Sequence, residues 1–328
     1  MPPLLEIKEL ITVFDTNRGR IKAVDGVSLS LQPGETLGIV GESGCGKTML
    51  ALSIMRLIPA NGSIINGSIF FQGQDLLKLS AEEIRSKRGN EIAMVFQEPM
   101  TSLNPVIRIG EQIAEAIRLH QNLPAKQALA LSIEQLREVG IPDPERRAQD
   151  YPHQLSGGMR QRVMVAMAMS CHPRLLLADE PTTALDVTIQ AQILDLISDL
   201  KEKNNMAVIL ITHDLGIVAQ TAENVAVMYA GKIVENSQVN EIFANPLHPY
   251  TKGLIASLPA SCSNDRQEHL ETIPGSVPSL YNLAAGCSFR ERCSWAETLC
   301  AEQDPELREI KSGHFVACWI AQQTKKLN

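Results

Sequence analysis

A glycine-rich loop between a strand and a helix constrains this chain more than any other feature. Residues 36–40 (TLGIV) are apolar and β-branched, which predicts a buried strand, and the residues from Lys47 onward (KTMLALSIMRLI) have helical apolar spacing. The loop between them, GESGCGKT, fits the pattern GxxxxGK[ST], whose glycines let backbone N–H groups converge on phosphate oxygens. We therefore predict an α/β fold whose nucleotide contacts include the loop residues Gly41, Glu42, Ser43, Gly44, Cys45, Gly46, Lys47 and Thr48.

Two residues of this phosphate loop (residues 41–48) have specific tasks. Lys47 is expected to reach the β- and γ-phosphates, and the Thr48 hydroxyl is expected to ligate Mg²⁺. Cys45 is a small residue at a variable position, so we assign it no chemistry of its own. A glycine-rich turn that binds nothing is the alternative, but strand, loop and helix occur in the order that the phosphate-binding pattern requires.

Two adjacent carboxylates follow a second apolar run. Residues 175–178 (LLLA) predict a buried parallel strand, and Asp179 and Glu180 come at its carboxyl end, where open α/β sheets bind ligands. We expect Asp179 to hold Mg²⁺ through its water shell and Glu180 to be the general base that activates the attacking water. A third predicted strand, 208–212, leads to His213, which could contact the γ-phosphate or orient the water. Adjacent acids or a histidine after a strand more often have a structural role when they occur alone. Here a phosphate loop lies upstream, so we favour a catalytic role for these three residues.

A second glycine pair marks another expected anion site. In LSGGMRQ, Ser156, Gly157 and Gly158 precede a helical run, VMVAMAMSC. With this segment the chain resembles the nucleotide-binding subunits of ABC transporters, and the resemblance implies that the segment closes over the γ-phosphate bound by a second subunit. It also implies that Gln97, in VFQEPM, senses Mg²⁺ and water, and that Asp186, in ALD, belongs to a loop that crosses the dimer interface.

The resemblance implies a fold and a division into domains. The expected fold class is α/β: a P-loop ABC ATPase domain with a mixed sheet core, an antiparallel β subdomain and a helical subdomain, followed by a small cysteine-containing extension. We predict an ATPase domain at 1–258, a helical subdomain at about 98–160 and an extension at 259–328. Phe14, in the strands expected before about residue 35, is the candidate to stack on adenine, with ordinary strand packing as the alternative.

Composition limits the partners. Lys and Arg total 30 against 37 Asp and Glu, a net charge of −7 without a polybasic tract, which argues against nucleic acid. The apolar runs are shorter than the roughly 18 residues that span a bilayer, and no secretion signal is recognisable. The resemblance implies a peripheral protein on the cytoplasmic face of the inner or plasma membrane, working with two transmembrane permease subunits. Because the chain has one set of phosphate motifs, a second ATPase subunit, for which the resemblance favours a paralogue, completes the pair. The resemblance also implies an extracytoplasmic solute-binding protein that takes part indirectly.

The last third of the chain resembles one particular group of ABC transporter subunits. His248-Pro249-Tyr250-Thr251 and the following KGLIASLP are similar to the region after the ATPase core in dipeptide and oligopeptide importer subunits. The favoured function is therefore an ATPase that energises uptake of such peptides. The same architecture could import nickel, a glycoside or an antimicrobial peptide. A soluble ABC ATPase of DNA repair or ribosomes is a different class, but it usually has a long coiled coil or two ATPase domains, and neither is recognisable here.

Four late cysteines have the spacing C-x5-C-x6-C-x17-C. A short extension that buries few apolar residues needs a cross-link to be stable. Disulfides are unfavourable in a cytosolic chain, so a bound metal is the natural candidate for that cross-link. The spacing leaves an iron–sulfur cluster, zinc and free thiols open, although zinc sites more often contain close C-x₂₋₄-C pairs. The resemblance favours a [4Fe–4S] cluster, which four thiolates suit. Its ligands are expected to be Cys287, Cys293, Cys300 and Cys318, whereas Cys45, Cys171 and Cys262 are expected to be ordinary thiols.

Overall fold

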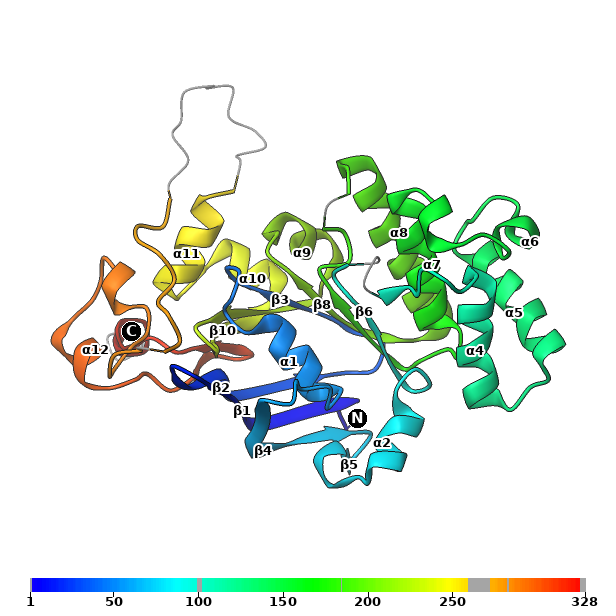
Figure 1. Cartoon of the computed structure of the whole chain (residues 1–328). Coiled ribbons are helices and arrows are strands. Elements are labelled where there is room, and N and C mark those ends of the chain that lie inside the picture. The colour runs from blue at the N-terminus through cyan, green and yellow to red at the C-terminus, as the bar shows by residue number, and fades with distance from the viewer. Residues whose placement is uncertain (1, 99–101, 184, 259–271, 282, 325–328) are drawn as a thin grey trace, which may run out of the picture. The chain divides into compact units, whose positions relative to one another are not determined.

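The computed structural model describes most of the chain as two compact units (Figure 1). Unit 1 comprises Met1–Leu4, Leu31–Glu35 and Asp75–Leu210, and unit 2 comprises Leu5–Ser30, Thr36–Gln74 and Ile211–Asn328. The domain boundary predicted at residue 258 lies inside unit 2 and stays a prediction. The described residues are 2–98, 102–183, 185–258, 272–281 and 283–324, so Ala184 and Cys262 lie outside them.

Unit 2 contains the predicted antiparallel β subdomain. Its sheet has the strand order β2-β1-β4-β5. β1 and β4 pair antiparallel from Leu5 opposite Phe71 to Phe14 opposite Gly62. The alternation of buried and exposed residues along β1 places one face of the sheet against apolar side chains, as expected for an antiparallel sheet with one wet face. The strands are β1 (Leu5–Thr16), β2 (Gly19–Leu31), β4 (Gly62–Phe71) and β5 (Gln74–Asp75).

A second sheet of unit 2 carries the phosphate loop. In this unit its strand order is β11-β12-β10-β9-β3, with β3 parallel to β9 and the other pairs antiparallel. All residues of β3 are buried, which confirms the strand predicted before the loop. The strands are β3 (Thr36–Val40), β9 (Asn224–Tyr229), β10 (Lys232–Gln238), β11 (Arg308–Lys311) and β12 (His314–Val316).

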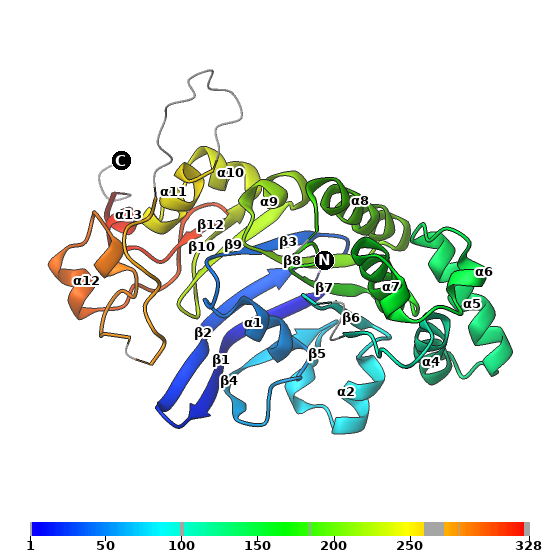
Figure 2. The ribbon, with the colours of Figure 1, turned by 45° about the horizontal axis from the view of Figure 1, so that its top comes forward.

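The helices of unit 2 lie before and after these strands in the chain. One apolar cluster joins β9 and β10 to α9, α10, α11 and Phe289, so residues near the end of the chain share a core with these two strands. Figure 2 shows α12 in orange and α13 in red, in the last part of the chain. The helices are α1 (Lys47–Ile54), α9 (Leu215–Thr221), α10 (Val239–Ala244), α11 (Pro249–Ala256), η3 (Arg290–Arg292), α12 (Thr298–Glu302) and α13 (Trp319–Thr324).

Unit 1 combines parallel strands with a group of helices. Its strand order is β8-β7-β6, and β6 pairs parallel with β7 from Ile92 opposite Leu175 to Val95 opposite Ala178. The strands are β6 (Ile92–Val95), β7 (Leu175–Asp179) and β8 (Ala207–Thr212), whose last two residues belong to unit 2. Every residue of the three strands is buried, as expected for parallel strands covered on both faces.

Helices α4 to α7 pack against one another (Figures 1 and 2). They occupy the region in which apolar spacing predicted helices. Nowhere in the described ranges is a helix both long and apolar enough to cross a membrane. The helices of unit 1 are η1 (Leu76–Lys78), α2 (Ala81–Lys87), α4 (Ile109–Gln121), α5 (Ala125–Glu138), α6 (Pro144–Arg147), η2 (Pro152–Gln154), α7 (Gly157–Met169) and α8 (Val187–Asn204).

Candidate nucleotide site

The phosphate loop follows β3 and ends at the N-terminus of α1. Gly46 is the N-cap of α1 at a φ of 109°, and a Cβ there would lie 2.1 Å from the Ala23 carbonyl oxygen. At Gly41, with a φ of 154°, a Cβ would lie 2.1 Å from the Met228 carbonyl oxygen. Only glycine fits either position, because a side chain would overlap neighbouring backbone. The two glycines therefore let the loop run directly against β2 and β9.

The Lys47 ammonium lies inside this loop. Its Nζ donates to the Gly41 carbonyl at 2.7 Å and to the Glu42 carbonyl at 3.1 Å, and the residue is 5 % exposed. A lysine ammonium is compact and has three donors, so it can exchange such carbonyl partners for phosphate oxygens.

The first turn of α1 has the properties of an anion site. No side chain caps it, and it contains no acidic residue. Its backbone N–H groups are therefore not occupied by a cap, and the helix dipole favours negative charge there. A Cβ at Gly44 would meet nothing within 4 Å, so the loop is open on that side. These features fit the binding of a phosphate chain.

In unit 1, Gln97 and Glu180 meet at the carboxyl ends of β6 and β7. Gln97 Nε2 donates to Glu180 Oε2 at 2.9 Å, and the Thr183 hydroxyl donates to the same oxygen at 2.9 Å. Glu180 has a φ of 44°, in the left-handed region, which costs about 1 kcal/mol for a residue with a Cβ. The two hydrogen bonds aim one oxygen of the carboxylate, as a positioned general base requires.

Asp179 and His213 are the other predicted catalytic or metal residues. Asp179 ends β7 and is 2 % exposed, whereas His213 follows β8 in unit 2 and is exposed. Asp179 is thus the last residue of its strand and His213 directly follows its strand, so both lie at the carboxyl end of a strand, as the sequence predicted.

The glycine pair of LSGGM begins α7, and Asp186 begins α8. Ser156 is the N-cap of α7, and its Oγ accepts from the Met159 N–H at 3.3 Å. A Cβ at Gly158 would lie 2.9 Å from Ile189, whereas one at Gly157 would lie 3.8 Å from Leu185. Asp186 caps α8 by accepting from the Ile189 N–H at 2.9 Å. The tight packing at Gly158 fixes the start of α7 against α8.

Comparisons with known proteins agree with this motif set. Residues 24–183 match the family described as "ABC transporter", and residues 234–300 match "Oligopeptide/dipeptide transporter, C-terminal region". The chain is 53 % identical over 325 residues to "Probable peptide ABC transporter ATP-binding protein y4tR" of Sinorhizobium fredii, covering 99 % of this chain and 97 % of that relative. It is 50 % identical to "Oligopeptide transport ATP-binding protein OppD" of Bacillus subtilis, covering 97 % of this chain and 88 % of the relative. The chain belongs to the family of peptide ABC transporter ATP-binding proteins.

Solved structures are similar to a large part of this ABC protein. A post-hydrolysis dimer of the ATP-binding cassette MJ0796 bound to ADP and Pi has a TM-score of 0.65 and 25 % identity, covering 72 % of this chain and 98 % of that one. The structure of cbiO1 from Clostridium perfringens, part of the ABC transporter complex cbiONQ, has a TM-score of 0.63 and 25 % identity, covering 75 % and 92 %. These likenesses confirm the predicted ABC ATPase fold.

Phe14 of this ABC protein is packed inside the antiparallel sheet. The residue is 8 % exposed, and a Cβ on Gly62, its partner across the strands, would lie 2.6 Å from the Phe14 ring. This placement favours the packing alternative that the sequence left open. Stacking of Phe14 on adenine stays a prediction.

The four C-terminal cysteines are free in the structure. The Cys287 N–H donates to the Cys300 carbonyl at 2.8 Å. Burial first, and then the charges of Cys300 and Cys318, raise the pKa of Cys287 to about 11. Among the described residues, however, no group of three or more His, Cys, Asp or Glu is arranged to hold a metal ion. The structure therefore does not confirm the predicted cluster.

Two residues that contact the phosphate loop were not predicted. Arg292 binds the Glu42 carboxylate, and the Tyr250 hydroxyl accepts from the Glu42 N–H at 2.8 Å. Tyr250 lies in the HPYT segment, which the sequence analysis noted only as a family feature. No sequence pattern marked Arg292, because it is 250 positions from Glu42.

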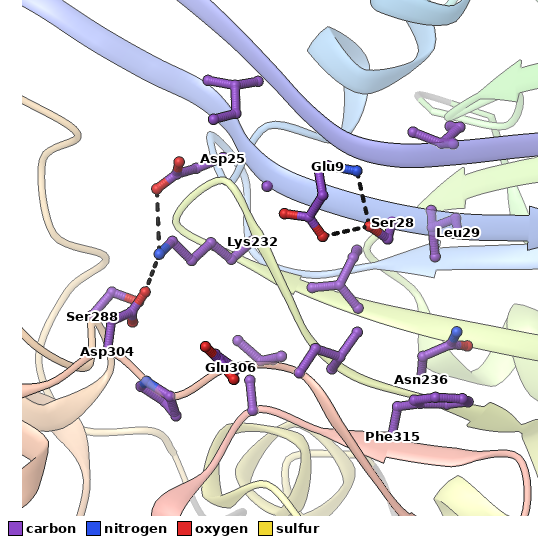
Figure 3. Close-up of a pocket in the computed structure, with 18 of the residues that line it drawn as sticks. Glu9, Asp25, Ser28, Leu29, Lys232, Asn236, Ser288, Asp304, Glu306 and Phe315 are labelled. Carbon is purple, nitrogen blue, oxygen red and sulfur yellow. Dashed lines mark hydrogen bonds and ion pairs between the residues drawn. The ribbon is translucent and has the colours of Figure 1, made fainter. Parts of the chain in front are cut away.

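A cavity of about 790 Å³ lies in unit 2 (Figure 3). Residues of β1, β2, β10 and the C-terminal region line it, and no phosphate-loop residue does. In it, Lys232 bridges two acids: its Nζ is 3.3 Å from Asp25 Oδ2 and also binds Asp304. The charge of Lys232 is thus balanced by two acids, and the phosphate loop lies outside this cavity.

Proposed function

We propose that this protein is the ATP-hydrolysing subunit that energises peptide uptake through an ABC importer. The observation that carries the proposal is about 50 % identity to peptide-transport ATP-binding proteins along nearly the whole chain, including the C-terminal region specific to oligopeptide and dipeptide transporters. Uptake of nickel, a glycoside or an antimicrobial peptide has no comparable support.

Nucleotide binding is assigned to the phosphate loop. Lys47 and the uncapped first turn of α1 bind the β- and γ-phosphates, and Gly41, Gly44 and Gly46 give the loop its shape. Ser43 and Cys45 contribute backbone rather than side chains. Cys45 is fully buried, and burial raises the pKa of its thiol, which disfavours the reactive thiolate.

Hydrolysis is assigned to Glu180, with Gln97 and Thr183 as the residues that hold its carboxylate. Glu180 takes a proton from the attacking water, and His213 orients that water or contacts the γ-phosphate. Mg²⁺, when bound with ATP, neutralises developing charge on the phosphates. The oxygen donors Thr48, Gln97 and Asp179 suit this hard cation.

The signature segment is assigned to a second ATPase subunit's nucleotide. Ser156, Gly157 and Gly158 begin a helix and can contact a γ-phosphate held elsewhere, while Asp186 lies at the subunit interface. The full transporter would contain two transmembrane permease subunits and a second, paralogous ATPase, with an extracytoplasmic solute-binding protein delivering peptide. The subunit would work peripherally at the cytoplasmic face of the membrane.

A Glu180→Gln variant tests the catalytic assignment. Because glutamine keeps the shape but cannot take the proton, ATP hydrolysis by the assembled transporter is expected to fall at least about 10²-fold, with ATP binding retained. Glu82→Gln, at an exposed position of α2, is the matched control and is expected to keep wild-type turnover. Wild-type hydrolysis in Glu180→Gln would refute the assignment.

The peptide assignment is tested in vesicles that contain the permeases and both ATPases. Peptide-loaded binding protein is expected to stimulate ATP hydrolysis, and nickel or a glycoside is not. Stimulation by one of those solutes instead would replace the substrate while leaving the ATPase assignment intact.

We also propose that Cys287, Cys293, Cys300 and Cys318 ligate a [4Fe–4S] cluster with a structural role. The support is the family resemblance and the presence of four thiols within one short segment of unit 2. Protein purified without oxygen is expected to be brown, to absorb broadly near 400 nm and to contain about four irons per chain. Stoichiometric zinc without iron, or no metal at all, would refute the cluster. Cys171→Ser, at a buried position of unit 1, is the control and should leave the iron content unchanged.

A further inference from the structure

An arginine of the C-terminal region is bound to the phosphate loop. Arg292 Nη1 donates to Glu42 Oε2 at 2.6 Å, and Arg292 Nη2 donates to Glu42 Oε1 at 3.0 Å. Both residues lie in unit 2. Two parallel charge-assisted bonds fix orientation as well as distance, so this pair is more specific than an ordinary surface ion pair.

The position of Arg292 is fixed by its other contacts. Its side chain is 5 % exposed, and its Nε donates to the Pro274 carbonyl at 2.9 Å. The guanidinium carbon lies 5.8 Å from the centre of the Tyr229 ring and 5.9 Å from that of Phe289. Cation–π contacts with two aromatic rings and a hydrogen bond to a backbone acceptor leave the guanidinium little freedom, so its position against Glu42 is fixed.

Glu42 is held at three points. Arg292 binds its carboxylate, the buried Tyr250 hydroxyl accepts from its N–H, and its carbonyl accepts from Lys47 Nζ at 3.1 Å. Tyr250 itself packs on Phe289, with ring centres 5.4 Å apart. The chain that follows the ATPase core therefore fixes the residue whose carbonyl binds the phosphate-loop lysine.

We infer that Arg292 is a positioning residue for the phosphate loop, so that ATP affinity depends on the folded C-terminal region. Through Glu42, Arg292 sets the backbone that places Lys47. The inference rests on the proposed function, because ATP is the ligand whose binding it modulates. The competing explanation is that the ion pair between Arg292 and Glu42 only stabilises the fold. In that case, removing the pair would lower stability without changing ATP affinity.

The test is ATP affinity in the full chain, measured by calorimetry with Mg²⁺, for Arg292→Gln, Glu42→Gln and the double variant. Each single variant is expected to bind ATP about tenfold more weakly, as for two coupled sites. The double variant is expected to be no weaker than either single one, because all three remove the same interaction. In hydrolysis assays of the assembled transporter, KM for ATP is expected to rise while kcat stays within about twofold.

Glu291→Gln is the control, since Glu291 is the exposed neighbour on the same 3-10 turn, and its ATP affinity is expected to match wild type. If Arg292→Gln does not fold, Glu42→Gln carries the test, because the Glu42 side chain is 30 % exposed. Unchanged ATP affinity in a folded Arg292→Gln or Glu42→Gln variant would overturn the inference alone. A wild-type chain that does not bind ATP would refute the proposed function and the inference with it.

Discussion

Removing the Glu235 carboxylate is expected to destabilise the C-terminal part of unit 2. Glu235, on β10, is fully buried and accepts three hydrogen bonds: from the Leu247 N–H at 2.7 Å, the His248 N–H at 2.9 Å and His314 Nε2 at 2.7 Å. These partners lie between α10 and α11 and on β12. One carboxylate thus joins β10 to a segment 12 to 13 positions along the chain and to β12, 79 positions away.

The size of the effect follows from the geometry. The Leu247 and His314 donors share Oε1, whereas the His248 N–H uses Oε2. In Glu235→Gln the amide oxygen can still accept from the Leu247 and His314 donors, but the amide N–H₂ then faces the His248 N–H and cannot accept from it. The free energy of unfolding is therefore expected to fall by about 2 kcal/mol. Glu235→Ala leaves all three donors buried without an acceptor, and a loss of about 4 kcal/mol is expected.

Urea unfolding followed by tryptophan fluorescence measures this loss. Both tryptophans of the chain, Trp295 and Trp319, lie in the C-terminal part of unit 2, so the signal reports the relevant region. Glu302→Gln, at an exposed position of α12, is the control and is expected to change stability by less than about 0.5 kcal/mol. A loss below about 1 kcal/mol in Glu235→Ala would show that the three bonds do not hold these segments together.

Three further expectations concern pH, nucleotide binding and the signature segment. Burial lowers the pKa of His248 to about 4 from its usual 6.5. Between these pH values the unfolded chain binds a proton at His248 that the folded protein does not. The free energy of unfolding should therefore fall as the pH drops from about 6.5 to 4. His248→Asn, which keeps an N-cap acceptor for Tyr250, should flatten that pH dependence of unfolding; an unchanged slope would assign it to other groups. Lys47→Ala should weaken ATP binding at least about tenfold by calorimetry, and unchanged affinity would contradict the role of the loop. Gly157→Glu should abolish transport in vesicles yet spare ATP binding to the isolated subunit, since a Cβ there meets only Leu185 at 3.8 Å; lost binding in the isolated variant would mean that the segment serves its own subunit's nucleotide.

The sequence alone determined the ABC fold and the identity of its motifs, because those motifs work over short stretches of chain. The phosphate loop needs glycines, a lysine and a helix N-terminus within eight consecutive residues, and such a pattern can be read directly. The pairing of Gln97 with Glu180 could also be anticipated, although they are 83 positions apart, because parallel strands place their carboxyl ends at one edge.

Only the tertiary structure decided which distant residues support these motifs. The contact of Arg292 with Glu42 and that of Glu235 with His314 join residues 250 and 79 positions apart, and no local sequence pattern links the partners of either contact. Phe14 shows the same limit, because an aromatic residue on a strand can face a ligand or the protein interior, and packing against Gly62 buries it. Burial and partner choice of this kind depend on how the sheets and the C-terminal segment pack, which apolar spacing along the chain does not specify.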